Sequence, residues 1–214
     1  MKKTFVLCLA LVALSAAAFA ADAQRNITIN GGKQTVFMGA HSRQAPAPCK
    51  KGAFYDNICG GSINIDEGWT VSNGSPINTQ YTPANQIVAL KSGTTTKLGV
   101  TVSFVEGTNG ATVYLTKDCS GVPCSSPDGK PKKDVLCSGT IKNLYNAGDP
   151  YVVEHTACKA KLTKGKPYWV FVDSDANSWL AWDLSAATGG LVEGTNDVWG
   201  SPSSGQPVGG LAIY

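Results

Sequence analysis

Beyond its first twenty residues, the sequence contains no apolar run long enough to cross a membrane. At the start, Lys2 and Lys3 precede a short apolar segment, and Ala18-Phe19-Ala20 matches a small-residue cleavage site. We therefore expect residues 1–20 to be a signal peptide that is removed before Ala21. The mature chain is expected to be secreted or periplasmic, from a bacterium, and without a membrane span.

The sequence also has little net charge. Without Lys2 and Lys3, the 18 basic residues fall to 16, against 15 acidic ones. Nucleic acids and anionic membranes attract proteins through an excess of basic residues. This balance gives no support for a nucleic-acid partner or for a membrane-surface protein.

The signatures of common catalytic and metal sites are missing as well. There is no G-x-S-x-G, H-E-x-x-H or P-loop pattern, no C-x-x-C pair, and only two His. Glu154 and His155 are the one adjacent acid–His pair, and neighbours on a strand point to opposite faces. We predict that the protein is not an enzyme and needs neither a cofactor nor a metal.

Helical periodicity is absent over any window of useful length. The 24 Gly and 11 Pro are instead spread between short runs rich in Val, Thr, Ile and aromatic residues. This pattern is typical of all-β proteins. We predict a disulfide-stapled, antiparallel β-sandwich of jelly-roll type at residues 62–214, after a lead-in and disulfide loop at residues 21–61.

Turn residues between the apolar runs predict four hairpins. They join Ile27–Ile29 to Gln34–Met38, Leu98–Glu106 to Ala111–Thr116, Val135–Asn143 to Tyr151–Leu162, and Trp169–Val172 to Trp179–Trp182.

Six cysteines remain once Cys8 leaves with the signal peptide. An even number of cysteines in an exported chain favours disulfides over a metal site. We predict the pairs Cys49–Cys59, Cys119–Cys124 and Cys137–Cys158. The last pair follows from a hairpin that turns at Ala147–Gly148 and places its two cysteines opposite each other, within disulfide range.

Four of the five Trp lie between Lys166 and Tyr214. On the strand after Ser178, Leu180, Trp182 and Leu184 share one face, which is expected to enter the core, and Trp179 shares the other with Asp183. An exposed Trp179 beside Asp173, Asp175 and Asn177 would suit sugar binding, so these four are the candidate ligand-binding residues. The alternative, which we prefer because large aromatic residues are mostly buried, is that both Trp residues are covered.

The segment from Asp173 to Asn177 also has oxygen ligands at positions 1, 3 and 5 of a calcium loop. The rest of the pattern fails, because Ser178 replaces the usual glycine and Leu184 replaces the bidentate Glu. We interpret the segment as a polar turn stabilised by local Asp and Asn hydrogen bonds.

Several strand and turn signals together resemble a known family. They are Thr112-Val113-Tyr114-Leu115, Asp118, Gly121-Val122-Pro123, Leu162-x-x-Gly165-x-x-Tyr168-Trp169, Trp199-Gly200 and Gly210–Tyr214. Over roughly the last two-thirds of the chain, this order resembles the choice-of-anchor domains of exported bacterial proteins, which are jelly-roll-like β-sandwiches. The resemblance implies a fold and an exported location, and it implies no catalytic residues.

Three functions fit these observations. The first is a secreted, non-enzymatic β-sandwich with a structural or interaction role. The second is a non-catalytic module that binds an extracellular glycan, or another surface protein, through exposed aromatic residues such as Trp179, Tyr168 or Trp199. The third is a hydrolase with paired carboxylates about 5–10 Å apart. An exposed aromatic patch would favour the second function, and a cleft with two carboxyl groups would favour the third.

Overall fold

The computed structural model describes residues 26–30, 33–37, 51–74, 77–130 and 132–214. Within these ranges the chain is built from strands, and the single helical segment is the short 3-10 turn η1 (Lys132–Asp134). No helix in this part of the chain is long and apolar enough to span a membrane.

The strands are β1 (Asn26–Asn30), β2 (Lys33–Phe37), β3 (Tyr55–Asp56), β4 (Ile63–Gly74), β5 (Thr79–Val88), β6 (Gly93–Thr94), β7 (Lys97–Val100), β8 (Val102–Gly107), β9 (Gly110–Cys119), β10 (Val122–Pro123), β11 (Val135–Lys142), β12 (Glu154–Ala157), β13 (Lys161–Leu162), β14 (Pro167–Ser174), β15 (Ser178–Thr195), β16 (Val198–Trp199), β17 (Ser203–Gly209) and β18 (Leu211–Ile213).

The largest sheet has the strand order β1-β2-β4-β15-β5-β14-β9-β10, and β11 extends it by pairing with β9. A four-stranded sheet has the order β12-β7-β18-β3, and β13 pairs with β6 in a small third sheet. All the described ladders are antiparallel. Strands far apart in the chain are neighbours, as in Greek-key and jelly-roll folds.

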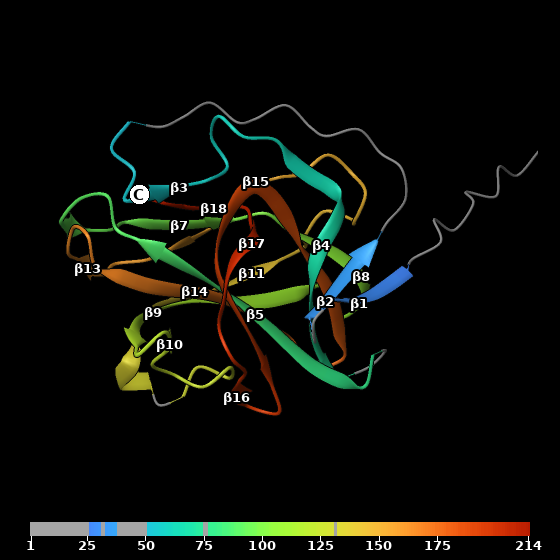
Figure 1. Ribbon diagram of the computed structural model, residues 1–214. Coiled ribbons are helices and arrows are strands. Elements are labelled where there is room, and N and C mark those ends of the chain that lie inside the picture. Colours follow the sequence, from blue (N-terminus) through green and yellow to red (C-terminus); the bar gives the residue numbers. More distant parts are fainter. Residues whose placement is uncertain (1–25, 31–32, 38–50, 75–76, 131) are drawn as a thin grey trace, which may run out of the picture.

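The two larger sheets face each other across one hydrophobic core. Leu98 and Val100 of β7 and Leu211 of β18 come from the smaller sheet, and they cluster with Val113 and Val170 of the larger one. Figure 1 shows β7 and β18 lying over β9 and β14. This packing confirms the predicted all-β, antiparallel, disulfide-stapled sandwich.

The 18-residue strand β15 connects most of the large sheet. Its first half pairs with β4 and β8, and its second half pairs with β5 and β17. Irregular pairing between Asp183 and Thr188 bends the strand between these halves. In Figure 1, β15 runs from the β4 side of the molecule over to β5 and β16.

Three of the four predicted hairpins are wrong in their pairing. β8 pairs with β15 instead of β9, and β14 pairs with β5 and β9 instead of β15. β11 joins β9 in the large sheet, whereas β12 joins β7 in the small one. The lead-in hairpin of β1 and β2 does form, with Asn30 paired to Lys33. A short turn can join strands of one ladder or carry the chain to another part of the fold, and only the burial of the strand faces decides which.

Two of the predicted disulfides are confirmed. Cys119 is bonded to Cys124, with 4.9 Å between the Cα atoms, and Cys137 is bonded to Cys158, with 5.4 Å. Cys59 is also disulfide-bonded, and Cys49 lies outside the described residues. The hairpin register that predicted Cys137–Cys158 is wrong, because Cys137 lies on β11 of the large sheet and Cys158 directly follows β12 of the small one.

Replacing Cys137 and Cys158 together by alanine is expected to lower the free energy of unfolding by about 2–4 kcal/mol. The bridge spans a sequence separation of 21 residues and ties the two sheets together. Urea unfolding of the oxidised protein measures the loss. The matched control removes Cys119–Cys124, which spans only 5 residues and is expected to cost less. A larger loss in the control variant would contradict this prediction.

Candidate functional site

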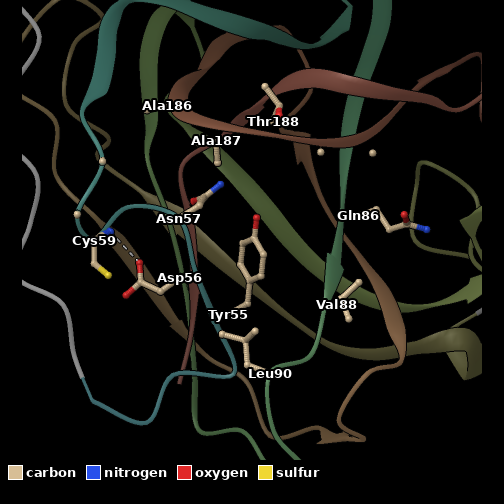
Figure 2. Close-up of a pocket in the computed structure, with 14 residues that line it drawn as sticks. Tyr55, Asp56, Asn57, Cys59, Gln86, Val88, Leu90, Ala186, Ala187 and Thr188 are labelled. Carbon is tan, nitrogen blue, oxygen red and sulfur yellow. Dashed lines mark hydrogen bonds between the residues drawn. The ribbon is translucent and has the colours of Figure 1, made fainter.

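An open cleft of about 700 Å³ lies beside the short strand β3. One wall is β3 with the loop that follows it, and the other wall is the end of β5 together with the bend of β15 (Figure 2). The side chains that the figure labels are Tyr55, Asp56, Asn57, Cys59, Gln86, Val88, Leu90, Ala186, Ala187 and Thr188. We call this hollow the Tyr55 cleft.

Tyr55 is placed in the cleft by the pairing of β3 with the last strand. Tyr55 is opposite Ile213, and Asp56 is opposite Ala212. Figure 2 shows the Tyr55 side chain standing between Asn57 and Val88, with its hydroxyl directed along the cleft. Burial raises the pKa of this hydroxyl, so Tyr55 presents a neutral, partly buried ring.

The polar side chains next to Tyr55 hold the wall of the cleft together. One carboxylate oxygen of Asp56 accepts hydrogen bonds from the amides of Ile58 (3.0 Å) and Cys59 (2.9 Å), and the other accepts one from the hydroxyl of Tyr214 (3.1 Å). This is the local bonding that makes Asp common in turns.

Asn57 ties the same wall to the C-terminal strands. Its side-chain nitrogen donates to the carbonyl of Gly209 (3.0 Å), and its side-chain oxygen accepts from the amide of Leu211 (2.6 Å). The loop that carries Tyr55 is therefore fixed by its own polar groups, and Tyr55 is held in a set position.

The opposite wall presents apolar and neutral polar groups. Val88 is 51% exposed and Leu90 is 63% exposed, so this wall offers aliphatic surface to a ligand. Thr188 adds an exposed hydroxyl. Gly190 lies close to Gln86, since a Cβ at position 190 would be 3.0 Å from that side chain, and the bent part of β15 therefore approaches β5 closely.

The chemistry of the cleft suits binding better than catalysis. It combines an aromatic ring, two exposed aliphatic side chains, a hydroxyl and backbone groups. Asp56 is the only carboxylate among the described lining residues, and both of its oxygens already accept hydrogen bonds. General acid–base hydrolysis of glycosides requires two carboxyl groups.

The sequence-predicted site residue Trp179 is buried, with 7% of its surface exposed. It packs against Val105 and Ala181, with Ile77 and Ala147 alongside. The expectation of an exposed Trp179 is therefore wrong, and the alternative, in which both Trp residues are covered, is what the structure has. The predicted alternation of the two strand faces is correct, but residues of β8 and of two loops also cover the face that carries Trp179.

The aromatic residues named as further sugar-binding candidates are also poorly placed for stacking. Tyr168 is buried and accepts a hydrogen bond from the amide of Thr163. Trp199 is partly buried against Phe171, with ring centroids 5.2 Å apart, and its indole N–H donates to the carbonyl of Ser125. The loop containing Ser125 covers this side of the sheet.

Asp173 lies near the end of β14, where it is paired with Thr112 of β9, whereas Asp175 and Asn177 lie in the turn between β14 and β15. Burial, together with the carboxylates of Asp128, Asp197 and Asp175, raises the pKa of Asp173 to about 7. Asn177 adopts a positive φ of 58°, and its amide donates to the carbonyl of Asn73. Asp175 is bonded through its amide to the carbonyl of Gly110. The segment is a turn held by backbone bonds on both sides.

Calcium is expected to leave the melting temperature unchanged. Calcium takes six to eight oxygen ligands, and no three His, Cys, Asp or Glu side chains within the described residues are grouped to hold a metal. Thermal melts in millimolar calcium and in chelator test this, because a ligand of the folded state must stabilise it. A rise of several degrees that Asp173→Asn removes would show a calcium site.

Sequence reasoning missed the Tyr55 cleft. Its residues come from three separate segments, around Tyr55, Val88 and Thr188, and none carries a motif. The one available signal was the short cysteine loop before Gly61, which marks a segment that needs covalent support.

Asp183 was also misplaced, because strand alternation put it on the outward face. It is fully buried, and its carboxylate accepts hydrogen bonds from Ser103 Oγ (2.8 Å) and from the hydroxyl of Tyr145. Burial raises the pKa of Asp183 to about 8, so the group is largely neutral at pH 7. It is a core residue and does not line the Tyr55 cleft.

Comparison with known proteins found no matching family model, no matching curated protein and no matching solved structure. The resemblance to choice-of-anchor domains therefore stays a prediction.

Proposed function

We propose that this chain is a secreted, non-enzymatic interaction protein that binds an extracellular glycan in the Tyr55 cleft. The observation that carries the proposal is the cleft itself, a hollow of about 700 Å³ in which a fixed tyrosine ring stands beside exposed Val88 and Leu90. Ligand pockets of this size combine apolar walls with a few placed polar groups.

Sugars match this combination of groups. The faces of sugar rings are apolar C–H surfaces that pack on aromatic and aliphatic side chains, whereas their hydroxyls require hydrogen-bonding partners. The Tyr55 hydroxyl, the Thr188 hydroxyl and the backbone of Gly189 and Gly190 supply such partners along the cleft. A second surface protein would also cover Val88 and Leu90, and it is the alternative that the experiment below separates.

Export is supported by the signal-peptide pattern of residues 1–20 and by the disulfides. Disulfides persist in oxidising compartments outside the cytosol. Cys119–Cys124 and Cys137–Cys158 both lie in the part of the chain that forms the sandwich.

A glycan array probed with the oxidised mature protein is expected to show binding that Tyr55→Ala weakens at least tenfold. A tenfold loss corresponds to about 1.4 kcal/mol, which one lost ring contact can supply. Because Tyr55 also packs against the core, Val88→Gln provides a second test that leaves the core intact.

The matched control is Val152→Gln. Val152 is also 51% exposed, but it does not line the cleft. Weaker binding by Val88→Gln together with unchanged binding by Val152→Gln supports the cleft. Equal effects of the two substitutions, or an array without any bound glycan, would contradict the proposal and favour a protein partner or a purely structural role.

A further inference from the structure

A second hollow, of about 380 Å³, carries positive charge next to the Tyr55 cleft. Its lining includes Lys117, Lys161 and Lys166 together with Leu136 and Tyr168. All three lysines are exposed. We call this hollow the lysine groove.

The three lysines come from segments that the fold fixes relative to one another. Lys117 of β9 is paired with Tyr168 of β14, and Lys161 belongs to β13. The carbonyl of Lys166 accepts a hydrogen bond from the backbone amide of Ala89, which directly follows β5 (3.1 Å). The backbones that carry the three ammonium groups are therefore held in place, although the side chains themselves remain free to adjust.

The charge of the groove is not cancelled by the fold. None of the three lysines forms an ion pair with another described residue. Asp118 is the one carboxylate in the described lining, so the three lysines and one aspartate leave the groove a formal charge of +2. The Oδ1 atom of Asp118 accepts hydrogen bonds from the indole N–H of Trp169 (2.6 Å) and from the side-chain amide of Gln86 (3.1 Å). Its Oδ2 accepts one from the backbone amide of Gly121 (3.2 Å).

The groove and the Tyr55 cleft adjoin each other. Gln86 lines the cleft, and the Asp118 to which it donates lines the groove. Val88 of the cleft is paired with Pro167 of the groove across β5 and β14. One extended ligand that lies across these ends of β5 and β14 would occupy both hollows.

We infer that the glycan bound by the protein is acidic, with its neutral ring faces in the Tyr55 cleft and its carboxylate or sulfate groups in the lysine groove. This inference rests on the proposed function, because it assumes that the ligand is a glycan. Lysine ammonium groups offer donors to carboxylate and sulfate oxygens alike, so the structure assigns the charge of the ligand and leaves the anionic group open. The net charge of the whole chain is close to zero, so it does not reveal this local excess of positive charge.

The test uses three polymers: polygalacturonate, dextran sulfate and uncharged dextran. Titration calorimetry of the oxidised mature protein is expected to show binding to at least one anionic polymer and at least tenfold weaker binding to dextran. Raising the salt from 50 to 300 mM should weaken that binding, because exposed charges are screened. Lys161→Gln/Lys166→Gln should weaken it at least tenfold.

The matched control is Lys133→Gln/Lys142→Gln, which removes the same charge from two exposed lysines outside the groove and is expected to leave binding nearly unchanged. Equal losses in both double variants would overturn the inference, since they would show a general charge effect.

Two further outcomes separate this inference from the proposed function. If an uncharged glycan binds and only the Tyr55 and Val88 variants weaken it, the cleft function stands and the acidic ligand is overturned. If the anionic polymers bind through the lysines but Tyr55→Ala and Val88→Gln have no effect, the single ligand that spans both hollows is overturned.

Discussion

Replacing Trp182 by alanine is expected to lower the free energy of unfolding by about 3–5 kcal/mol, which is typical for truncating a buried Trp. Trp182 is fully buried in the main core, and its indole N–H donates to the carbonyl of Gly210 (3.0 Å). Gly209 lies directly against the ring, where a Cβ would collide with it. Alanine would therefore leave a cavity and remove one hydrogen bond to the Gly210 carbonyl, which still accepts from the amide of Thr101 (3.0 Å).

Trp179 supplies the matched comparison for this prediction. Its indole nitrogen is buried but has no hydrogen-bond partner. Phenylalanine at position 179 would remove that unpaired group, whereas phenylalanine at position 182 would break the bond to Gly210. We expect Trp182→Phe to cost more stability than Trp179→Phe in urea unfolding, and the reverse order would contradict this assignment.

The protein is expected to become less stable as the pH rises from about 4 to about 8, and Asp183 is expected to cause a large part of this loss. Its pKa is about 8 in the folded protein, against about 3.9 in an unfolded chain. Between these values the folded state keeps a proton that the unfolded state has released. Stability therefore falls as pH rises, by up to about 1.4 kcal/mol per pH unit from this one group.

Asp183→Asn tests this linkage, since an amide imitates the neutral acid and cannot ionise. Ser103 can still donate to the side-chain oxygen, and the Tyr145 hydroxyl can turn to accept from the new amide. We expect the variant to have a much flatter dependence of stability on pH between 4 and 8. Asp173 has a raised pKa too, so the difference between the two proteins, and not the slope of either, isolates Asp183. Parallel pH profiles would show that Asp183 does not titrate in this range.

Strand β15 shows how much of the buried and exposed surface could be predicted from the sequence. Its alternation correctly sent Trp182 and Leu180 into the core, because a period of two follows from the extended backbone alone. The same alternation assigned Trp179 and Asp183 to solvent, and both are buried. A local pattern separates two faces, but whether a further layer covers the second face depends on parts of the chain that are distant in sequence.

The disulfide Cys137–Cys158 shows the same limit for the prediction of strand pairing. The even cysteine count and an assumed hairpin register led to the right bond. The hairpin on which its geometry was argued does not exist, since β11 and β12 belong to different sheets. Antiparallel opposition and face-to-face packing both bring Cα atoms within disulfide range, so the bond does not distinguish them.

The sequence by itself determined the class of the protein: an all-β chain with an export signal pattern, paired cysteines and a Trp-rich last segment that enters the core. These properties depend on composition, alternation and turn residues, which act over a few positions. Only the tertiary structure decided which strands are neighbours, and with that it created the Tyr55 cleft and the lysine groove. Tyr55, Val88 and Lys161 carry no signal of their own, because their meaning comes from being brought together by β18, β5 and β13. The physical reason is that the strand order is set by the burial of apolar faces, and this burial does not depend on how far apart the strands are in the sequence.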